Sequence, residues 1–148
     1  MTKKPKKPVK PPSSPRVSIY LPDGLRDLLS GSDSLSRRIG AVATRYAFLT
    51  DESMPELTRD EWCAVLEANS GVFPLDRPAQ PALLWANVAD AKGLDTKWGV
   101  DIGQLVETLR GWTAAETMAA IEACGRFDQS NKPVDQSLAD CGCRIRRD

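Results

Sequence analysis

The side chains best suited to metal or redox chemistry in this 148-residue sequence are its four cysteines. The closest pair is Cys141-Gly142-Cys143, and four thiolates can hold zinc. One residue between two ligands is tighter than the usual two to four, and Cys63 and Cys124 lie within apolar helical stripes. We therefore expect Cys63 and Cys124 to act as small core residues, and we expect no metal and no cofactor. A labile disulfide between Cys141 and Cys143 stays an alternative.

Other catalytic groups are equally scarce. The chain has no histidine, which removes the commonest base for a serine or cysteine nucleophile. It has no glycine-rich phosphate-binding loop with its lysine and serine or threonine. The adjacent carboxylates Asp51/Glu52 and Asp60/Glu61 stand at expected helix starts, where they favour the helix dipole. The sequence predicts no enzyme.

The formal net charge of zero hides two halves of opposite sign. Residues 1–50 hold ten Lys and Arg against three Asp, a net of +7, whereas residues 51–148 hold ten against seventeen Asp and Glu, a net of −7. This asymmetry predicts a basic, anion-seeking N-terminal part joined to an acidic remainder. There is no apolar run of transmembrane length and no secretory signal, and four cysteines without an export signal are typical of the reducing cytoplasm. We expect a cytoplasmic protein.

Residues 1–15 form the most basic stretch. Five lysines stand among five prolines, and Val9 is the one sizeable apolar residue. Such a segment cannot bury enough apolar surface to fold, so we expect a disordered arm. The arm either follows DNA phosphates or serves only as a solubilising tail. The lysines concerned are Lys3, Lys4, Lys6, Lys7 and Lys10.

Residues 16–21 alternate polar and apolar side chains and stop at Pro22, which predicts a β-strand. If two copies of the chain pair these strands, Val17, Ile19 and Leu21 turn inward. Arg16, Ser18 and Tyr20 then share the outer face. A two-stranded ribbon of this width fits the major groove of DNA.

Two helices are expected next. Pro22 suits a first helical turn, and Leu25, Leu28 and Leu29 give a short apolar stripe. A turn around Gly31 ends that helix, and Asp33 or Ser34 can cap the next. Along the second helix the apolar face is made of Leu35, Ile39, Val42, Tyr46 and Leu49.

Strand, helix, turn and helix in this order resemble the ribbon-helix-helix family of DNA-binding proteins. The matching stretches are Arg16–Pro22 and Ser34–Ile39 with Tyr46. The resemblance covers about residues 16–50, and the first helix is shorter than is usual in the family. It implies an intertwined homodimer whose antiparallel ribbon enters the major groove.

The resemblance also implies a role for each matching residue. Arg16, Ser18 and Tyr20 contact bases. The N-terminus of the second helix and the arm contact phosphates, through Ser34, Leu35, Ser36, Arg37, Arg38, Lys3, Lys4, Lys6, Lys7 and Lys10. The dimer core holds Val17, Ile19, Leu21, Ile39, Val42 and Tyr46. An ordinary solvent-facing strand and helix face is the alternative for the polar positions.

Beyond residue 50 the sequence predicts a linker over 51–57, a helical domain over 58–127 and a flexible tail over 128–148. Thr58 with Glu61, and Thr113 with Glu116, have the spacing of capping boxes. Four tryptophans are expected as anchors of a small bundle. The expected fold class is mainly α: a ribbon-helix-helix unit, with one strand and two helices per chain, followed by a small helical domain.

Three functions fit these patterns. The leading one is a sequence-specific double-stranded DNA-binding regulator, a repressor that acts as a homodimer. The second is an accessory DNA-binding protein of a plasmid or mobile element, in partition, DNA transfer or as an antitoxin, whose residues 58–127 bind a protein partner. The third is a protein-interaction module with an incidental basic tail, which would be monomeric.

Overall fold

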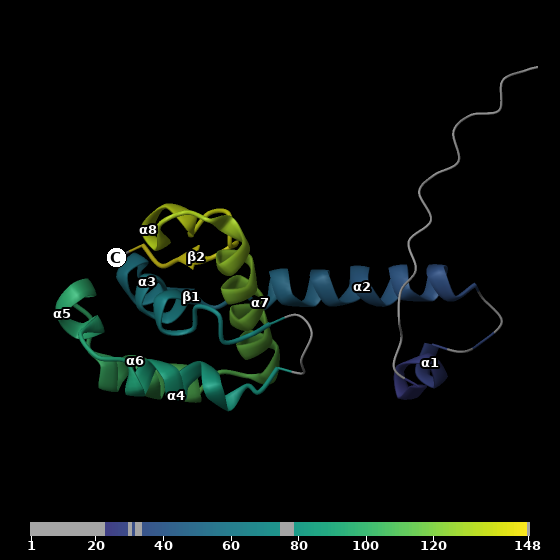
Figure 1. The fold of residues 1–148 in the computed structure, drawn as a ribbon, viewed down its shortest axis with the longest axis horizontal. Helices are drawn as coiled ribbons and strands as arrows, with labels where there is room; N and C mark the ends of the chain where they lie inside the picture. Colours follow the sequence, from purple (N-terminus) through teal and green to yellow (C-terminus); the bar gives the residue numbers. More distant parts are fainter. Residues whose placement is uncertain (1–22, 30, 32–33, 75–78, 148) are drawn as a thin grey trace, which may run out of the picture. The chain divides into compact units, whose positions relative to one another are not determined.

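The structure is a computed structural model that describes residues 23–29, 31, 34–74 and 79–147. This part of the chain is mainly helical, with eight helices and one two-stranded sheet (Figure 1). The predicted arm and strand, residues 1–21, lie outside the described residues. Within those residues no helix is both long and apolar enough to cross a membrane.

The chain divides into two compact units, residues 1–39 and residues 40–148. The first contains α1 (Asp23–Leu29) and the first turn of α2 (Leu35–Glu52). The division therefore falls within α2, whereas the sequence predicts a linker at 51–57. Part of that linker is helical, because α2 continues through Glu52, and Glu56–Leu57 forms the strand β1.

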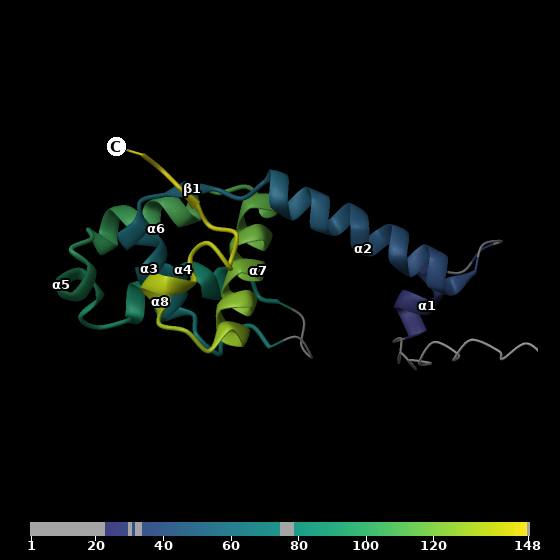
Figure 2. The same ribbon diagram turned by 90° about the horizontal axis from the view of Figure 1, so that it is seen from above.

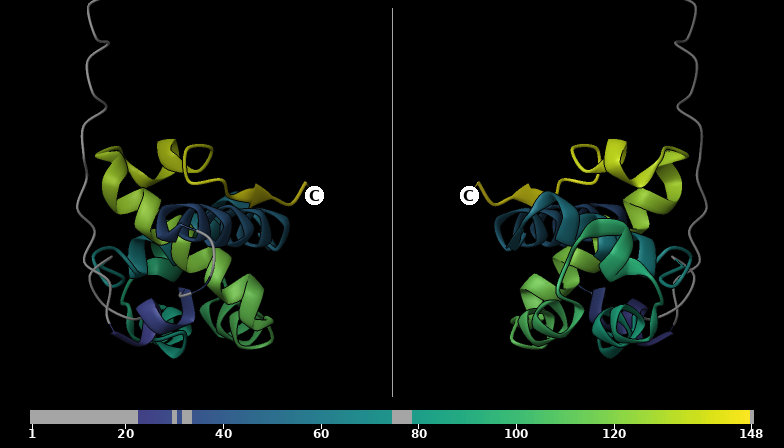
Figure 3. Two further views of the ribbon diagram at one scale, coloured as in Figure 1. Left: turned by 90° about the vertical axis from the view of Figure 1, so that its right-hand side faces the viewer. Right: turned by 90° about the vertical axis from the view of Figure 1, so that its left-hand side faces the viewer.

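The second unit holds the rest of α2 and the remaining elements. They are β1 (Glu56–Leu57), α3 (Arg59–Ala68), α4 (Ala82–Asp90), α5 (Leu94–Trp98), α6 (Ile102–Arg110), α7 (Ala114–Ser130), α8 (Val134–Ser137) and β2 (Arg144–Ile145). Helix α4 packs along α6, and α8 lies beside α7 near that helix's end (Figures 2 and 3).

Helix α3 is the centre of this unit. Its five consecutive residues from Trp62 to Leu66 are fully buried, since α3 contacts α4, α5, α7 and α8. The predicted capping box is confirmed: Glu61 N donates to Thr58 Oγ1 at 3.3 Å, and Thr58 N donates to the Glu61 carboxylate at 2.8 Å. These hydrogen bonds satisfy two backbone N–H groups that would otherwise have no partner, and so they fix where α3 begins.

The second predicted capping box, at the start of α7, is also confirmed. Thr113 N donates to Glu116 Oε2 at 2.7 Å, and Glu116 N donates to Thr113 Oγ1 at 3.2 Å. Asn131, in the left-handed conformation with φ 52°, follows the last residue of α7. Asparagine tolerates this conformation better than most residues, which suits it to end a helix.

The four tryptophans are not equally buried. Trp62 is fully enclosed, and its ring centroid lies 6.3 Å from that of Trp112. Trp85, Trp98 and Trp112 are half-buried and pack against the edge of the core. The Arg110 guanidinium lies 4.3 Å from the Trp85 ring centroid, which is a cation–π contact.

The C-terminal segment differs from the flexible tail predicted over residues 128–148. α7 extends to Ser130, α8 follows, and β2 pairs in parallel with β1, with Leu57 opposite Ile145. Cys141 is fully buried, and Trp62 Nε1 donates to the Arg144 carbonyl at 2.8 Å. A few buried side chains and backbone hydrogen bonds thus order a segment that is polar in composition.

Candidate nucleic-acid interface

The short helix α1 and the start of α2 form the described part of the predicted DNA-binding unit. α1 spans seven residues, as short as the sequence indicates, with Leu29 buried and Leu25 exposed. Ser34 caps α2: its Oγ accepts a hydrogen bond from Arg37 N at 3.3 Å, and its carbonyl accepts one from Arg38 N at 3.1 Å. Ser34, one of the two residues predicted as a cap, therefore caps α2.

Gly31, in the segment between the helices, lies against a basic side chain. A Cβ added at Gly31 would collide with the Arg38 guanidinium. Arg38 is thus folded back over Gly31 and half-buried, whereas Arg37 is exposed. Of the two predicted phosphate contacts at these positions, Arg37 is the more accessible.

The apolar stripe of α2 lies largely at the surface of the single chain. Leu35, Val42, Tyr46 and Leu49 are exposed, with 48% of Val42 accessible, and Ile39 is half-buried. These residues recur at helical spacing and share one face. An exposed stripe of this kind is typical of a surface that another element covers.

The C-terminal end of α2 is hydrogen-bonded to another element of the second unit, to which it belongs. Thr50 is buried, and its hydroxyl donates to the carbonyls of Tyr46 and Ala47. Arg144 donates from its guanidinium to the Asp51 carbonyl at 2.9 Å and more weakly to the Glu52 carbonyl at 3.4 Å. A cation at this end satisfies backbone acceptors that a helix leaves unpaired.

Tyr46 makes a second attachment. Its hydroxyl donates to Glu122 Oε1 on α7 at 2.9 Å. Partial burial of the phenol, followed by the hydrogen bond to Glu122 and the charge of that carboxylate, raises the pKa of Tyr46 to about 12. Tyr46, predicted as a dimer-core residue, therefore also holds α2 against its own chain.

The remaining predicted contacts fall outside the described residues. These are the base contacts Arg16, Ser18 and Tyr20, the inward residues Val17, Ile19 and Leu21, and the lysines Lys3, Lys4, Lys6, Lys7 and Lys10. Four of the predicted phosphate contacts, Leu35, Ser36, Arg37 and Arg38, lie on the first turn of α2. Ser34 directly precedes that turn, so the structure places these five residues together.

The four cysteines carry free thiols, and three of them are buried. Burial raises the pKa of Cys63 to about 11 and that of Cys143 to about 12, and it also raises the pKa values of Cys124 and Cys141. Protonated thiols are poor nucleophiles. Among the described residues, no three Cys, Asp or Glu side chains gather so as to hold a metal ion.

Sequence reasoning missed two residues that position α2, Glu122 and Arg144. They lie 76 and 93 residues along the chain from the Tyr46 and Asp51 atoms that they bind, and no local pattern signals such pairs. Comparison with protein-family models, with curated proteins and with solved structures finds no match to this chain.

Proposed function

We propose that this protein is a homodimeric, sequence-specific double-stranded DNA-binding regulator of the ribbon-helix-helix type, acting as a repressor. The observation that carries the proposal is the exposed apolar face of α2, from Leu35 to Leu49. In the proposed dimer a second copy covers part of this face. The sequence of residues 16–21 then supplies the ribbon that reads bases.

Two further features support the proposal. A short helix and a capped long helix, with Gly31 between them, follow the candidate strand in the order that the family resemblance requires. The +7 charge of residues 1–50 favours a polyanion, and the lysines of residues 3–10 add affinity without sequence preference.

The direct test is a titration of the full chain with duplexes selected from a random pool. Arg16→Ala should cost about 1–3 kcal/mol and relax preference at one base pair, because a bidentate contact to guanine is lost. Binding should weaken steeply with salt as counterions are released. If Arg16→Ala combined with Tyr20→Ala binds the selected duplex as well as the wild type does, the ribbon does not read DNA.

A second candidate keeps DNA binding and adds a protein partner, as in an accessory protein of a plasmid or mobile element. It is favoured by the size of the second unit, which forms a compact body with its own core around α3. Purification of the full chain from its native cells, with and without nuclease, distinguishes the two. A stoichiometric protein that co-elutes after nuclease treatment supports the accessory role.

A further inference from the structure

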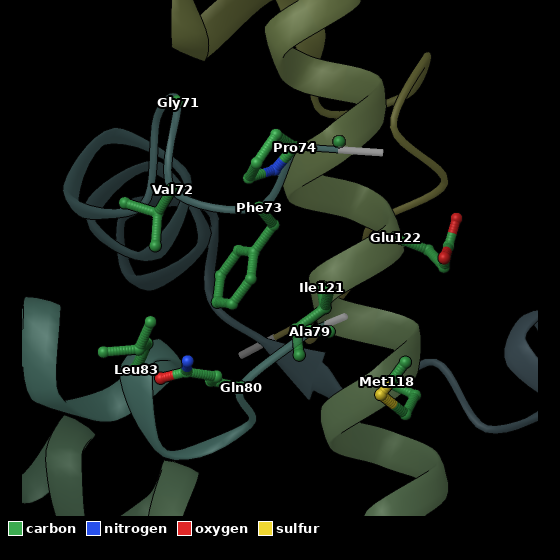
Figure 4. A pocket seen from close by; sticks show the side chains of 11 residues that line it. Gly71, Val72, Phe73, Pro74, Ala79, Gln80, Leu83, Met118, Ile121 and Glu122 are labelled. Atoms are coloured by element: carbon green, nitrogen blue, oxygen red, sulfur yellow. The ribbon is translucent and has the colours of Figure 1, made fainter. Parts of the chain in front are cut away.

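A cavity of about 580 Å³ opens on one side of α7 in the second unit. Its walls are one face of α7, residues 71–74 after α3, and residues 79–83 at the start of α4 (Figure 4). Volumes between roughly 300 and 1,000 Å³ are typical of pockets for small molecules. The lining residues are Gly71, Val72, Phe73, Pro74, Ala79, Gln80, Leu83, Met118, Ile121, Glu122 and Gly125.

The α7 wall contains a glycine that packing does not require. Gly125 lies well inside the 17-residue helix, where glycine costs about 1 kcal/mol relative to alanine. A Cβ at Gly125 would meet no atom within 4 Å, so no neighbour excludes a side chain there. Met118, Ile121 and Gly125 share one face at helical spacing, and the glycine leaves that face open to the cavity.

The remaining walls, as far as the described residues form them, are mostly apolar. Val72, Phe73 and Leu83 line the side of the cavity opposite α7 (Figure 4). Glu122 is the one ionisable group among the lining residues, and its carboxylate already accepts the Tyr46 hydroxyl. The Glu122 carboxylate would repel an anionic ligand.

We propose that this pocket is a binding site for a small, uncharged, apolar molecule. Residues such as Phe73, Leu83 and Ile121 supply the apolar contact, and Met118 adapts to the shape of the ligand because its side chain is unbranched. Gln80 offers an amide that can orient one polar atom. The proposed pocket and the proposed DNA binding are independent, so a negative result for one does not contradict the other.

The test uses two dyes that share one ring system. N-phenyl-1-naphthylamine is neutral, and 8-anilinonaphthalene-1-sulfonate is its anionic counterpart. With the full chain, the neutral dye should brighten on binding at one site per chain, and the anion should bind at least about tenfold more weakly. Absence of binding by the neutral dye, or equal binding of both, overturns the proposal.

Matched variants locate the dye. Gly125→Leu projects a side chain from the open position and should weaken binding of the neutral dye about tenfold or more, whereas Gly125→Ala should bind within about twofold of wild type. Because an exposed apolar stripe such as that of α2 is a second surface to which an apolar dye can bind, Val42→Glu serves as a further control and should bind the neutral dye as wild type does. A loss with Val42→Glu, or none with Gly125→Leu, places the dye elsewhere and contradicts the proposal.

A second measurement needs no pocket variant. With ¹³C-labelled methionine methyl groups, the neutral dye should shift the Met118 resonance, because Met118 lines the cavity, and leave that of Met54, which is buried and does not line it. Met118→Leu assigns the signal. An unchanged Met118 resonance at saturating dye overturns the proposal even if Gly125→Leu does not fold.

Discussion

The Tyr46 hydroxyl on α2 donates a 2.9 Å hydrogen bond to Glu122 Oε1 on α7. The two residues are 76 positions apart in the sequence. Tyr46 belongs to the apolar stripe, and Glu122 lies at the edge of the cavity on α7. This bond therefore connects the helix proposed to dimerise with the helix that forms the wall of the pocket.

The environment of Tyr46 predicts that its phenol loses its proton at an unusually high pH. The pKa of Tyr46 is about 12 in the folded protein and 10.0 ordinarily, so folding favours the neutral phenol. The resulting stabilisation is fully present below pH 10 and is lost as pH rises from 10 to 12. Phenolate absorbance at 295 nm should show this titration in a Tyr20→Phe background, where Tyr46 is the remaining tyrosine.

Glu122→Gln is the control for this titration. The variant removes the negative charge but keeps a hydrogen-bond acceptor, so the pKa of Tyr46 should fall. It should stay above 10, because burial is the largest cause of the shift. A Tyr46 that titrates near pH 10 in the parent protein would show that the phenol is neither buried nor bonded to Glu122 in solution.

Replacement of the buried Asn69 side chain by a side chain of similar size should strongly destabilise the folded protein. Its side chain is fully buried, and Nδ2 donates to the carbonyls of Val65 and Leu84 at 2.9 and 3.1 Å. Asn69→Asp replaces both donors with acceptors and should lower the free energy of unfolding by about 3–5 kcal/mol. Urea unfolding followed by Trp fluorescence measures the loss.

Asn87 provides the matched comparison. Its Nδ2 donates to Asn69 Oδ1 at 3.0 Å, and it is only half-buried. Asn87→Asp should therefore cost about 1 kcal/mol, clearly less than Asn69→Asp. Equal losses for the two variants would contradict the assignment of Asn69 as the central residue of this network.

The cysteines should be slow to react while the protein is folded. Burial raises the pKa of Cys143 to about 12, so little thiolate exists at pH 8. Cys143 is half-buried and should react first with a disulfide reagent, and Cys63, Cys124 and Cys141 should react at the rate of unfolding. Rapid modification of Cys124 in the native protein would contradict its burial in the core.

The capped helices of the second unit were predictable because their signals are local. Thr58 and Thr113 are each followed three residues later by glutamate, and both capping boxes form as predicted. Local chemistry of this kind depends on neighbours in the chain and needs no knowledge of the tertiary fold.

The C-terminal strand was not predictable, because its partners are distant. Arg144–Ile145 is a two-residue segment that becomes a strand through pairing with Glu56–Leu57, and Trp62 Nε1 donates a hydrogen bond to the Arg144 carbonyl. The continuation of α2 beyond Leu49 depends on Thr50, which is buried, and on the Arg144 contacts at its end. The candidate interface was predictable only as the spacing of an apolar face, and the sequence alone did not reveal that Tyr46 also binds Glu122.

Replacement of Gly40 by alanine should stabilise α2. It lies within α2 at the division between the two units, and a Cβ there would meet no atom within 4 Å. Gly40→Ala should therefore strengthen the helix by up to about 1 kcal/mol. Hydrogen exchange of the α2 amides should slow around residue 40. Faster exchange or lower helicity would mean that α2 bends at this glycine in solution.

The apolar face of α2 gives the sharpest test of the proposed dimer. Val42 lies on that face, whereas its exposed neighbour Ala41 lies about 100° further round the helix and off the stripe. Val42→Glu places a carboxylate in the proposed interface and should yield a monomer by light scattering, with weaker DNA binding. Ala41→Glu introduces the same charge one residue away and should remain dimeric. A dimeric Val42→Glu protein, or a wild-type chain that is monomeric at micromolar concentration, would contradict dimerisation through α2.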